Sequence, residues 1–232
     1  MNLDAAKRVA ETIVERLRPL CQRIEIAGSI RRGRPEVGDI DLVVLAADVE
    51  AVKRRCLERC QTITNGDQNF IVRMPGGLQV DIFFARGPLT DMFAPQPSNW
   101  ASLLVLRTGS REHNIFLVEK ARALGLRWDP YRGVLDPDGY VISGEDEGSI
   151  YNALGMPLVE PRFRELEYMT EHFPLAAPRQ SQISNLKSQK PAPAPAPPAA
   201  PTAAGLAALA ELHALGESLK PQEPQETPAK PG

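Results

Sequence analysis

The stretch AGSIRRGRPEVGDIDLVV, residues 27–44, predicts how this chain begins to fold. It follows a short run of alternating apolar residues and ends in an apolar segment led by two aspartates. In a β-strand, side chains two residues apart leave the same face. Asp39 and Asp41 are therefore expected side by side on one face. Ile40 and Leu42 then point the other way, into a core.

The acidic pair and the turn before it suggest a site for metal and phosphate. Two carboxylates this close resist ionising together unless a cation offsets them, and hard oxygen ligands suit Mg²⁺. Gly28 and Ser29 supply backbone N–H groups and a hydroxyl for phosphate oxygens, and Arg31, Arg32 and Arg34 add fixed positive charge. A lone Asp-x-Asp is usually a solvated strand end, but this context favours nucleotide phosphates bridged to carboxylates by magnesium.

The spacing of these residues resembles a known signature. Gly28-Ser29, a short spacer, and then Gly38-Asp39-x-Asp41 is similar to the motif of the DNA polymerase β-type nucleotidyltransferases. The Arg-Arg-Gly that follows the serine by one residue resembles the family X DNA polymerases in particular. The resemblance implies a palm in which a third carboxylate stands on a later strand.

Asp81 supplies that carboxylate, because it is the single acid in the apolar run of residues 78–84. Residues 69–74 also alternate like a strand, and Pro75-Gly76-Gly77 predicts a hairpin loop between the two runs. The returning strand is expected to lie beside the acidic strand. Three carboxylates would then share one site.

Helical patterns surround these strands. Apolar residues recur with helical spacing from Leu3 to Leu17, and Asp48 is expected to cap a helix running to about Cys60. The second helix is expected to carry four basic residues on a solvated outer face: Lys53, Arg54, Arg55 and Arg59. The predicted class is α+β, with a nucleotidyltransferase palm, a mixed β-sheet backed by helices, over residues 1–97.

The segment after residue 97 carries a second motif. Ser98 is expected to cap a helix, and the Thr-Gly-Ser turn at residues 108–110 separates it from the next one. With Asn114, this turn resembles the thumb of family X polymerases, where such residues contact the incoming nucleotide. The match continues through Ile150-Tyr151-Asn152-Ala153-Leu154-Gly155. We therefore expect a small α/β thumb over residues 98–175. His113 is interpreted as structural rather than catalytic.

Residues 176–232 differ in composition and are expected to be a disordered tail rich in Pro and Ala. Eleven of the 22 prolines lie between residues 178 and 232. A leucine-bearing segment at 203–219 suggests a short helix, which alone would be marginal in water. The alternative is a helix that folds on contact with a protein partner.

Composition limits the partners. The formal net charge is −2, and the first 175 residues hold 22 Lys and Arg against 25 Asp and Glu. DNA binding must therefore come from local basic patches, and its affinity should fall as the salt concentration rises. Three cysteines without a C-x-x-C pair indicate reduced thiols, and no apolar run is long enough for a membrane span. A cytoplasmic protein is expected.

Two departures from the resembled family matter. One helix precedes the signature, so the chain looks like a minimal palm-plus-thumb form without the family's amino-terminal lyase and fingers domains. The alternative is that its DNA-holding parts lie on another chain. Leu106 and Arg107 stand where the family places Tyr-Phe, a pair that crowds the ribose 2′ position. Strict preference for deoxyribonucleotides is therefore not expected.

The resemblance implies a template-directed DNA polymerase that extends a primer 3′-hydroxyl and releases pyrophosphate, with short-gap filling in DNA repair as its role. Two Mg²⁺ ions, which Mn²⁺ can replace, would be held by Asp39, Asp41 and Asp81. The expected partners are nucleoside triphosphates and primer-template or gapped DNA. The predicted nucleotide-binding residues are Gly28, Ser29, Arg32, Gly38, Gly109, Ser110, Arg111 and Asn114.

Two alternatives remain open. One is a nucleotidyltransferase with the same catalytic core but a different acceptor, such as an RNA end, a protein hydroxyl or a small molecule. The other is a non-catalytic polymerase accessory subunit whose tail recruits a partner.

Overall fold

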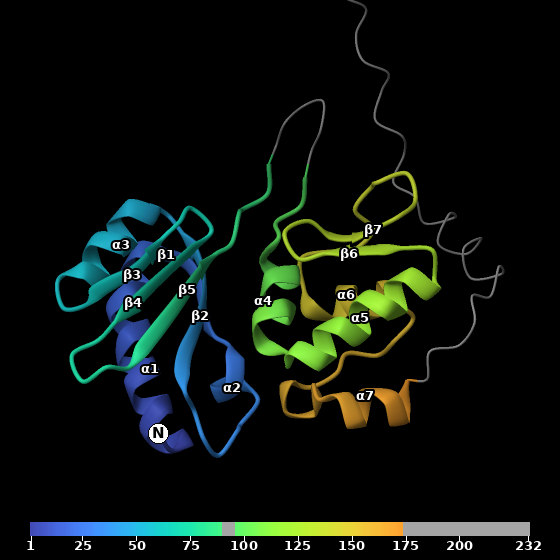
Figure 1. Ribbon diagram of the computed structural model, residues 1–232. Helices are drawn as coiled ribbons and strands as arrows, with labels where there is room; N and C mark the ends of the chain where they lie inside the picture. The colour runs from blue at the N-terminus through green and yellow to red at the C-terminus, as the bar shows by residue number, and fades with distance from the viewer. Residues whose placement is uncertain (90–95, 174–232) are drawn as a thin grey trace, which may run out of the picture. The chain divides into compact units, whose positions relative to one another are not determined.

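A computed structural model describes residues 1–89 and 96–173 of the chain (Figure 1). Strands dominate the first half of this part and helices the second, so the predicted α+β class is confirmed. The predicted tail at 176–232, with its candidate helix at 203–219, lies outside the described residues. The domain bounds at residues 97 and 175 stay predictions.

A five-stranded sheet with the order β1-β2-β5-β4-β3 organises the first half. The strands are β1 (Cys21–Ile26), β2 (Asp39–Ala46), β3 (Gln61–Asn65), β4 (Asn69–Arg73) and β5 (Gln79–Phe84). β2 and β5 are parallel, and the other neighbouring pairs are antiparallel. Because β4 and β5 form the predicted hairpin, with Gly76 and Gly77 at positive φ in its loop, β5 returns beside the acidic strand.

Two helices cover one face of this sheet. They are α1 (Leu3–Leu17) and α3 (Val49–Leu57), and their N-terminal caps are the side chains of Asn2 and Asp48. Leu17 of α1 and Val52 of α3 pack on the alternate strand residues Ile40, Leu42 and Ile82, all fully or almost fully buried. Each such aliphatic side chain contributes roughly 1.5–3 kcal/mol by leaving water.

The opposite face is covered by α4 (Trp100–Thr108). Val43 and Phe83 of the sheet pack here against Trp100, Leu103 and Leu104 of the helix. Because side chains alternate along a strand, Asp39 and Asp41 share this face with Val43. The carboxylates therefore stand at one end of the face, and the apolar residues that bind α4 follow them along the strand.

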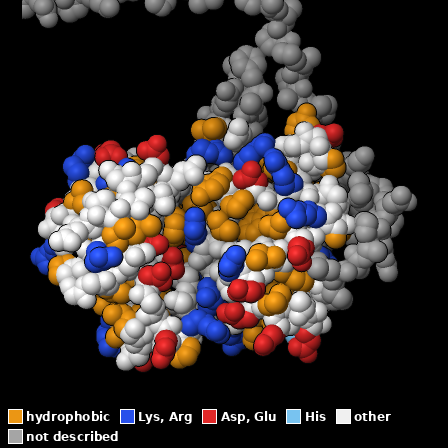
Figure 2. Space-filling model, viewed as in Figure 1, with side chains coloured by type: hydrophobic (Ala, Val, Ile, Leu, Met, Phe, Trp, Pro, Cys, Tyr) orange, Lys and Arg blue, Asp and Glu red, His pale blue; other side chains and the backbone are white. Residues whose placement is uncertain are grey.

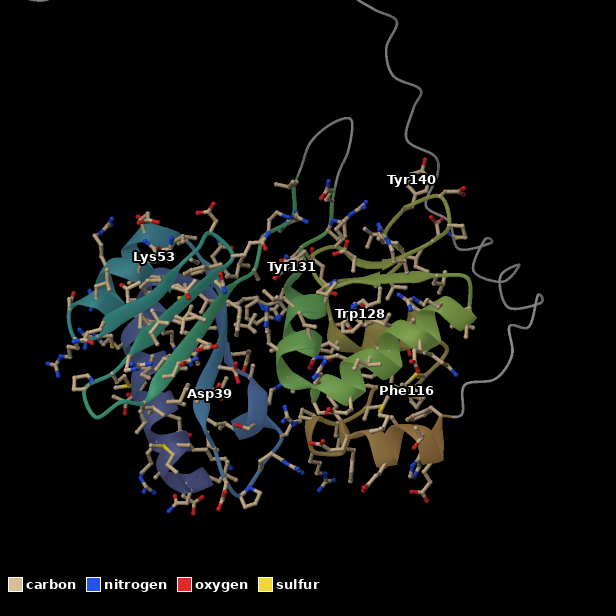
Figure 3. All side chains as sticks on the ribbon, viewed as in Figure 1. Asp39, Lys53, Phe116, Trp128, Tyr131 and Tyr140 are labelled. Atoms are coloured by element: carbon tan, nitrogen blue, oxygen red, sulfur yellow. The ribbon has the colours of Figure 1, made fainter. Side chains whose placement is uncertain are left out.

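The second half is built on a core of its own, to which α4 also contributes. Ala101 and Val105, on the side of α4 turned from the sheet, pack with Phe116, Trp128 and other buried residues (Figure 3). A helix buried on two sides must be apolar nearly all round, as the sequence WASLLVL is. The other elements are α5 (Arg111–Ala123), β6 (Arg127–Asp129), β7 (Gly133–Leu135), α6 (Glu147–Ala153) and α7 (Leu166–His172), with 3₁₀ turns at Arg18–Leu20 and Pro161–Phe163.

Three local predictions were wrong. Lys53 is buried and pairs with Glu50 at 3.1 Å, because the aliphatic stem of a lysine can line a core while its amine reaches the helix edge. α3 ends at Leu57 rather than near Cys60. The residue that caps α4 by position is Asn99, while the Ser98 hydroxyl accepts a hydrogen bond from the Trp100 N–H.

A short helix that the sequence pattern did not predict, α2 (Gly28–Arg31), joins the two halves. Its Arg31 binds both oxygens of Glu147 on α6, at 2.8 and 2.7 Å, and also donates to the Thr108 hydroxyl. Arg164, which is fully buried, donates to the same Glu147 carboxylate at 2.8 Å and to the Val159 carbonyl. Burial opposes the charge of Glu147, but its two arginine partners outweigh burial and lower its pKa.

No helix in residues 1–89 or 96–173 is both long and apolar enough to cross a membrane.

The arginine–glutamate network predicts a large loss of stability when its acid is neutralised. Glu147→Gln should lower the free energy of unfolding by roughly 3 kcal/mol, because it leaves the guanidinium of Arg164 buried without a counter-charge. Urea unfolding measures this. Glu160→Gln is the control, since Glu160 pairs with Arg162 at the surface and both side chains are more than 60% exposed. Its change should stay within about 0.5 kcal/mol, and equal losses for the two variants would contradict the network's role.

Candidate active site

Gly28 lets the backbone pass directly against the Asp41 carboxylate. Its φ is +58°, and a Cβ at this position would lie 1.8 Å from Asp41 Oδ2. The Ala27 N–H donates to the Asp41 carbonyl at 2.8 Å and holds the two segments together. Any side chain at position 28 would therefore displace the carboxylate.

Ser29, the second residue of α2, carries a hydroxyl without a partner. Its Oγ is buried and makes no hydrogen bond to the described part of the chain. Leaving a buried polar atom unpaired costs about 1–3 kcal/mol. The hydroxyl is therefore available to a bound oxygen that the protein itself does not supply.

The register of the sheet brings the predicted carboxylates together. In the parallel pair β2–β5, Asp41 lies directly opposite Asp81 and Asp39 lies opposite Gln79. All four side chains leave the same face, because residues 39 and 41, like 79 and 81, are two apart. The Gln79 amide donates to Asp81 Oδ1 at 2.8 Å and orients that carboxylate.

Burial and mutual repulsion act on these acids. Burial, followed by the charges of Asp39 and Asp81, raises the pKa of Asp41 to about 7, while Arg107 and Arg32 oppose the rise. Burial also raises the pKa of Asp81, against the Gln79 hydrogen bond. A cation placed among the three groups would relieve this crowding.

Among the described residues, no three His, Cys, Asp or Glu side chains are arranged to hold a metal ion. The donor types nevertheless fit a hard divalent cation, since carboxylate oxygens are the ligands that Mg²⁺ prefers. The charges of Asp39 and Asp81 act on the pKa of Asp41, and the charge of Asp39 acts on the pKa of Asp81. The three acids therefore lie close enough to interact electrostatically. The metal-binding role of the three aspartates stays a prediction.

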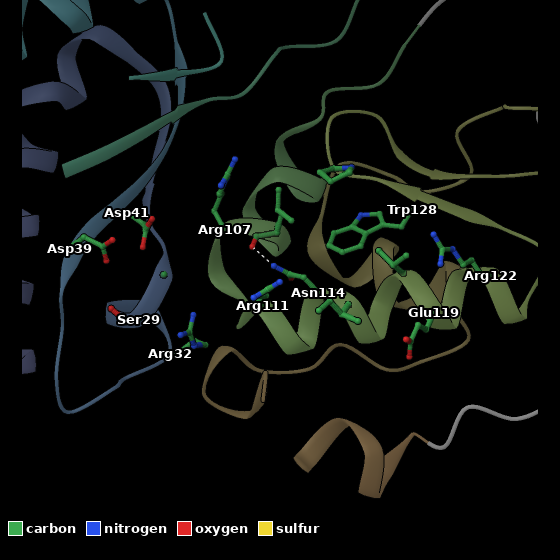
Figure 4. A pocket seen from close by; sticks show the side chains of 16 residues that line it. Ser29, Arg32, Asp39, Asp41, Arg107, Arg111, Asn114, Glu119, Arg122 and Trp128 are labelled. Atoms are coloured by element: carbon green, nitrogen blue, oxygen red, sulfur yellow. Dashed lines mark hydrogen bonds between the residues drawn. The ribbon is translucent and has the colours of Figure 1, made fainter. Parts of the chain in front are cut away.

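The carboxylate face opens into a cavity of about 720 Å³ between the sheet and α5 (Figure 4). That volume suits a nucleotide-sized ligand. Eight of the predicted site residues line it: Gly28, Ser29, Arg32, Asp39, Asp41, Gly109, Arg111 and Asn114. The other three do not. Asp81 lies behind on β5, Ser110 is buried as the cap of α5, and Gly38 has open space where a Cβ would be.

The turn between α4 and α5 positions Asn114. Its Nδ2 donates to the Leu106 carbonyl at 2.8 Å, so its Oδ1 faces His113 Nδ1 at 3.1 Å. Because that oxygen only accepts, Nδ1 carries the proton and Nε2 accepts from the Tyr151 hydroxyl, 3.0 Å away. Burial lowers the pKa of His113 to about 4. A neutral, fully buried histidine agrees with the structural interpretation of this residue.

Gly109 is required at the same turn. A Cβ at this position would lie 2.2 Å from His113 Nδ1 and 2.8 Å from Asn114 Oδ1. A side chain here would therefore break the hydrogen bond that orients Asn114.

Basic side chains gather along the middle of the face shown in Figure 2, with acidic side chains on both sides of them. Arg32 lines the cavity, yet it also donates to the Thr108 carbonyl at 2.7 Å and pairs with Glu165 at 3.1 Å. Arg107 lies at the end of α4 with its guanidinium 3.7 Å from the centre of the Phe83 ring. The sequence pattern pointed to Arg107 only in connection with sugar selection and did not point to Gln79, although a cation directly before Thr-Gly-Ser was a usable signal.

Comparisons with known proteins agree with this geometry. The family described as DNA polymerase beta thumb matches residues 103–165. The DNA polymerase/3′-5′ exonuclease PolX of Bacillus subtilis (strain 168) is 27% identical over 165 residues, which cover 69% of this chain and 28% of that protein. The chain is thus similar to the family X DNA polymerases. It spans little more than a quarter of the length of this relative.

Solved structures share the fold of this polymerase-like chain. The ternary P/T complex of Leishmania infantum polymerase beta superposes with a TM-score of 0.57 at 16% identity, covering 71% of this chain and 76% of that one. The ternary gap complex of the same protein gives a TM-score of 0.58, again at 16% identity, with 71% and 70% covered. At this identity the likeness establishes the fold, and it confirms the resemblance to a palm and thumb.

The close contact between Gly28 and Asp41 predicts that a side chain at position 28 destabilises the protein by more than its unfavourable backbone conformation alone would. Gly28→Ala should destabilise the protein by more than about 2 kcal/mol, because the new methyl group meets the Asp41 carboxylate as well as adopting positive φ. Gly33→Ala is the matched control: Gly33 has φ +72°, but a Cβ there would have nothing within 4 Å. It should cost about 1 kcal/mol. Urea midpoints that fall equally in both variants would contradict the contact.

The burial of His113 predicts a stability term that depends on pH. Below pH 6.5 the imidazole of His113 binds a proton in the unfolded chain, whereas in the folded chain it stays neutral down to about pH 4. Stability from this group is therefore complete above pH 6.5 and is lost as the pH falls toward 4, by on the order of 3 kcal/mol. Unfolding curves of the wild type and His113→Gln, compared across this range, measure the difference.

His172→Gln serves as the control for that titration, since His172 is exposed on α7. Its pH dependence should follow the wild type. A His113→Gln variant whose stability falls with pH as steeply as the wild type would show that His113 is not the group responsible.

Proposed function

We propose that this chain is a template-directed DNA polymerase that adds nucleotides to a primer 3′-hydroxyl and fills short gaps. The observation that carries the proposal is the register of Asp41 opposite Asp81, on a face that opens into a cavity lined by both halves of the protein. Small molecules fit such a cavity, and its opposite side carries the thumb-type helix α5 with Arg111 and Asn114.

The names of similar proteins support the same reaction. The Bacillus relative is a DNA polymerase, and the Leishmania structures are ternary complexes described as P/T and gap. Because the chain spans 28% of the Bacillus protein, the activity and the DNA partner are carried over as proposals. Repair of short gaps is proposed on the same basis.

Asp39, Asp41 and Asp81 are the residues that would hold two Mg²⁺ ions, with Mn²⁺ as a substitute. When bound, such ions lower the pKa of an attacking hydroxyl and offset charge on the leaving pyrophosphate. Burial, followed by repulsion from Asp39 and Asp81, raises the pKa of Asp41, and a cation that offsets this repulsion is favoured there.

Asp81 is the proposed acceptor for the primer proton. Its Oδ1 is engaged by the Gln79 amide, which leaves Oδ2 to take the proton from the 3′-hydroxyl. The freed 3′-oxygen forms a bond to the α-phosphorus as the bond from that phosphorus to pyrophosphate breaks. The raised pKa of Asp81 makes it a stronger base than an exposed aspartate.

The remaining site residues would hold the nucleotide. The unpaired Ser29 hydroxyl and the Arg32 guanidinium are suited to the outer phosphates, and Gly38 would leave room beside them. Gly109, Ser110, Arg111 and Asn114 would form the sugar and base side of the cavity. Ser110 would act there through its position as the cap of α5.

Nothing in the geometry of the cavity requires a deoxyribose. Leu106 and Arg107 line it where the resembled family has two aromatic residues. We therefore propose that the protein accepts ribonucleotides as well as deoxyribonucleotides. A protein partner for the tail and a cytoplasmic location stay predictions.

The decisive experiment incubates the full chain with Mg²⁺, a one-nucleotide-gapped duplex and each deoxy- and ribonucleoside triphosphate in turn. We expect addition of the nucleotide complementary to the template. Asp81→Ala should reduce transfer by at least about 100-fold while nucleotide binding stays within about threefold, because a general base acts on the chemical step. Asp67→Ala, an exposed carboxylate on the β3–β4 turn, is the control and should retain activity.

Three results would count against the proposal in different ways. Wild-type turnover by Asp81→Ala would remove that residue from the mechanism. Label transfer to RNA ends or to protein, without extension of DNA, would indicate another acceptor. No Mg²⁺-dependent incorporation on gapped, nicked and primed templates would leave the non-catalytic accessory subunit.

A further inference from the structure

Arg107 occupies an unusual place beside the carboxylates. It lies in the last turn of α4, and its guanidinium stacks 3.7 Å from the centre of the Phe83 ring. Phe83 stands two residues after Asp81 on β5, so both leave the same face of the sheet. The Nε of Arg107 is buried and has no hydrogen-bond partner in the described part of the chain.

Arg107 lies on the same side of the sheet as the three acids, because the Phe83 ring on which it stacks follows Asp81 by two residues on β5. Arg32 also lines the cavity, but it is already held by Glu165 and the Thr108 carbonyl. Figure 4 shows Arg107 between the strand that carries Asp39 and Asp41 and the helix that carries Asn114. Arg107 also lines the same cavity as those aspartates.

Arginine suits this place for physical reasons. Its guanidinium is always charged at working pH, and its flat face can rest on an aromatic ring without using its N–H groups. Stacking on Phe83 thus holds the charge of Arg107 near the carboxylates.

We propose that Arg107 is the resident counter-ion of the Asp39, Asp41 and Asp81 cluster and sets how tightly that cluster binds divalent cations. This inference rests on the proposed function, because it takes the three aspartates as the cation site. A fixed positive charge offsets part of the repulsion among the acids while no cation is bound. The same charge repels an entering divalent cation, so it lowers the affinity of the site.

The direct consequence is a gain of affinity on neutralising the arginine. The divalent cation and the single charge of Arg107 lie several ångströms apart near the surface. Removing the repulsion between them corresponds to a change of about 3- to 10-fold in the dissociation constant of the cation. Arg107→Gln should therefore bind Mn²⁺ about 3- to 10-fold more tightly than the wild type. Arg107→Lys keeps the charge and should stay within about twofold of it.

The test is a Mn²⁺ titration of the full chain, with free Mn²⁺ followed by electron paramagnetic resonance at pH 8 and low salt. An alkaline pH favours the charged form of the carboxylates, which is the form that binds a cation. Arg122→Gln is the matched control: it removes one arginine from the same cavity, but Arg122 lies on α5, away from the strand that carries Asp39 and Asp41 (Figure 4). Its affinity should equal that of the wild type.

Salt separates an electrostatic role from a structural one. At 0.5 M NaCl the gain of Arg107→Gln should shrink, since salt screens charges that are partly exposed. Thermal unfolding confirms that each variant is folded. A gain that salt leaves unchanged, a gain shared by Arg122→Gln, or a dissociation constant for Arg107→Gln no lower than that of the wild type would each overturn the proposal.

Asp41→Asn distinguishes this inference from the proposed function. If it abolishes Mn²⁺ binding while Arg107→Gln has no effect, the cation site stands and the role of Arg107 is refuted. If the wild type shows no Mn²⁺ binding that depends on Asp41, both the role of Arg107 and the metal chemistry of the proposed function fail.

Discussion

The structure depends on holding three carboxylates on one face of a sheet. Parallel pairing of β2 with β5 sets Asp41 opposite Asp81, and the repulsion between such neighbours must be offset for the fold to be stable. The surroundings provide this in part. The Gln79 amide binds Asp81, and the charges of Arg107 and Arg32 oppose the rise in the pKa of Asp41. The repulsion that remains is the physical basis of the proposed cation site.

The cavity exists because one helix belongs to two cores. α4 packs Leu103 and Leu104 on the sheet and Val105 on the helical half, so the position of α5 opposite the carboxylates follows from α4. The Arg31–Glu147 pair adds a polar contact at the other end of the junction. Leaving one partner of a buried ion pair without its counter-charge costs free energy. The pair therefore favours the arrangement of the two halves in which both partners meet.

Much of the fold was predictable from local pattern. The apolar spacing from Leu3 to Leu17 matched the bounds of α1, and strand alternation placed Asp39 and Asp41 on the face opposite Ile40. The prediction for Lys53 was wrong because a charged residue was assigned to the exposed face of the helix. In the structure the aliphatic stem of Lys53 packs against the core while its amine reaches Glu50. The helix α2 was missed because four residues are too few to show a period.

Residue order was enough to single out the three candidate acids and to predict that Asp81 would return beside the acidic strand. Strand period and hairpin length, on which this prediction depends, are local properties. The environment of those residues came from the packing of the two halves. Arg31 meets Glu147 across 116 positions, and Arg107 comes to rest on Phe83 beside Asp81. Charge and burial act through space, so the pKa of Asp41 and the position of Arg107 depend on distances that residue spacing does not determine.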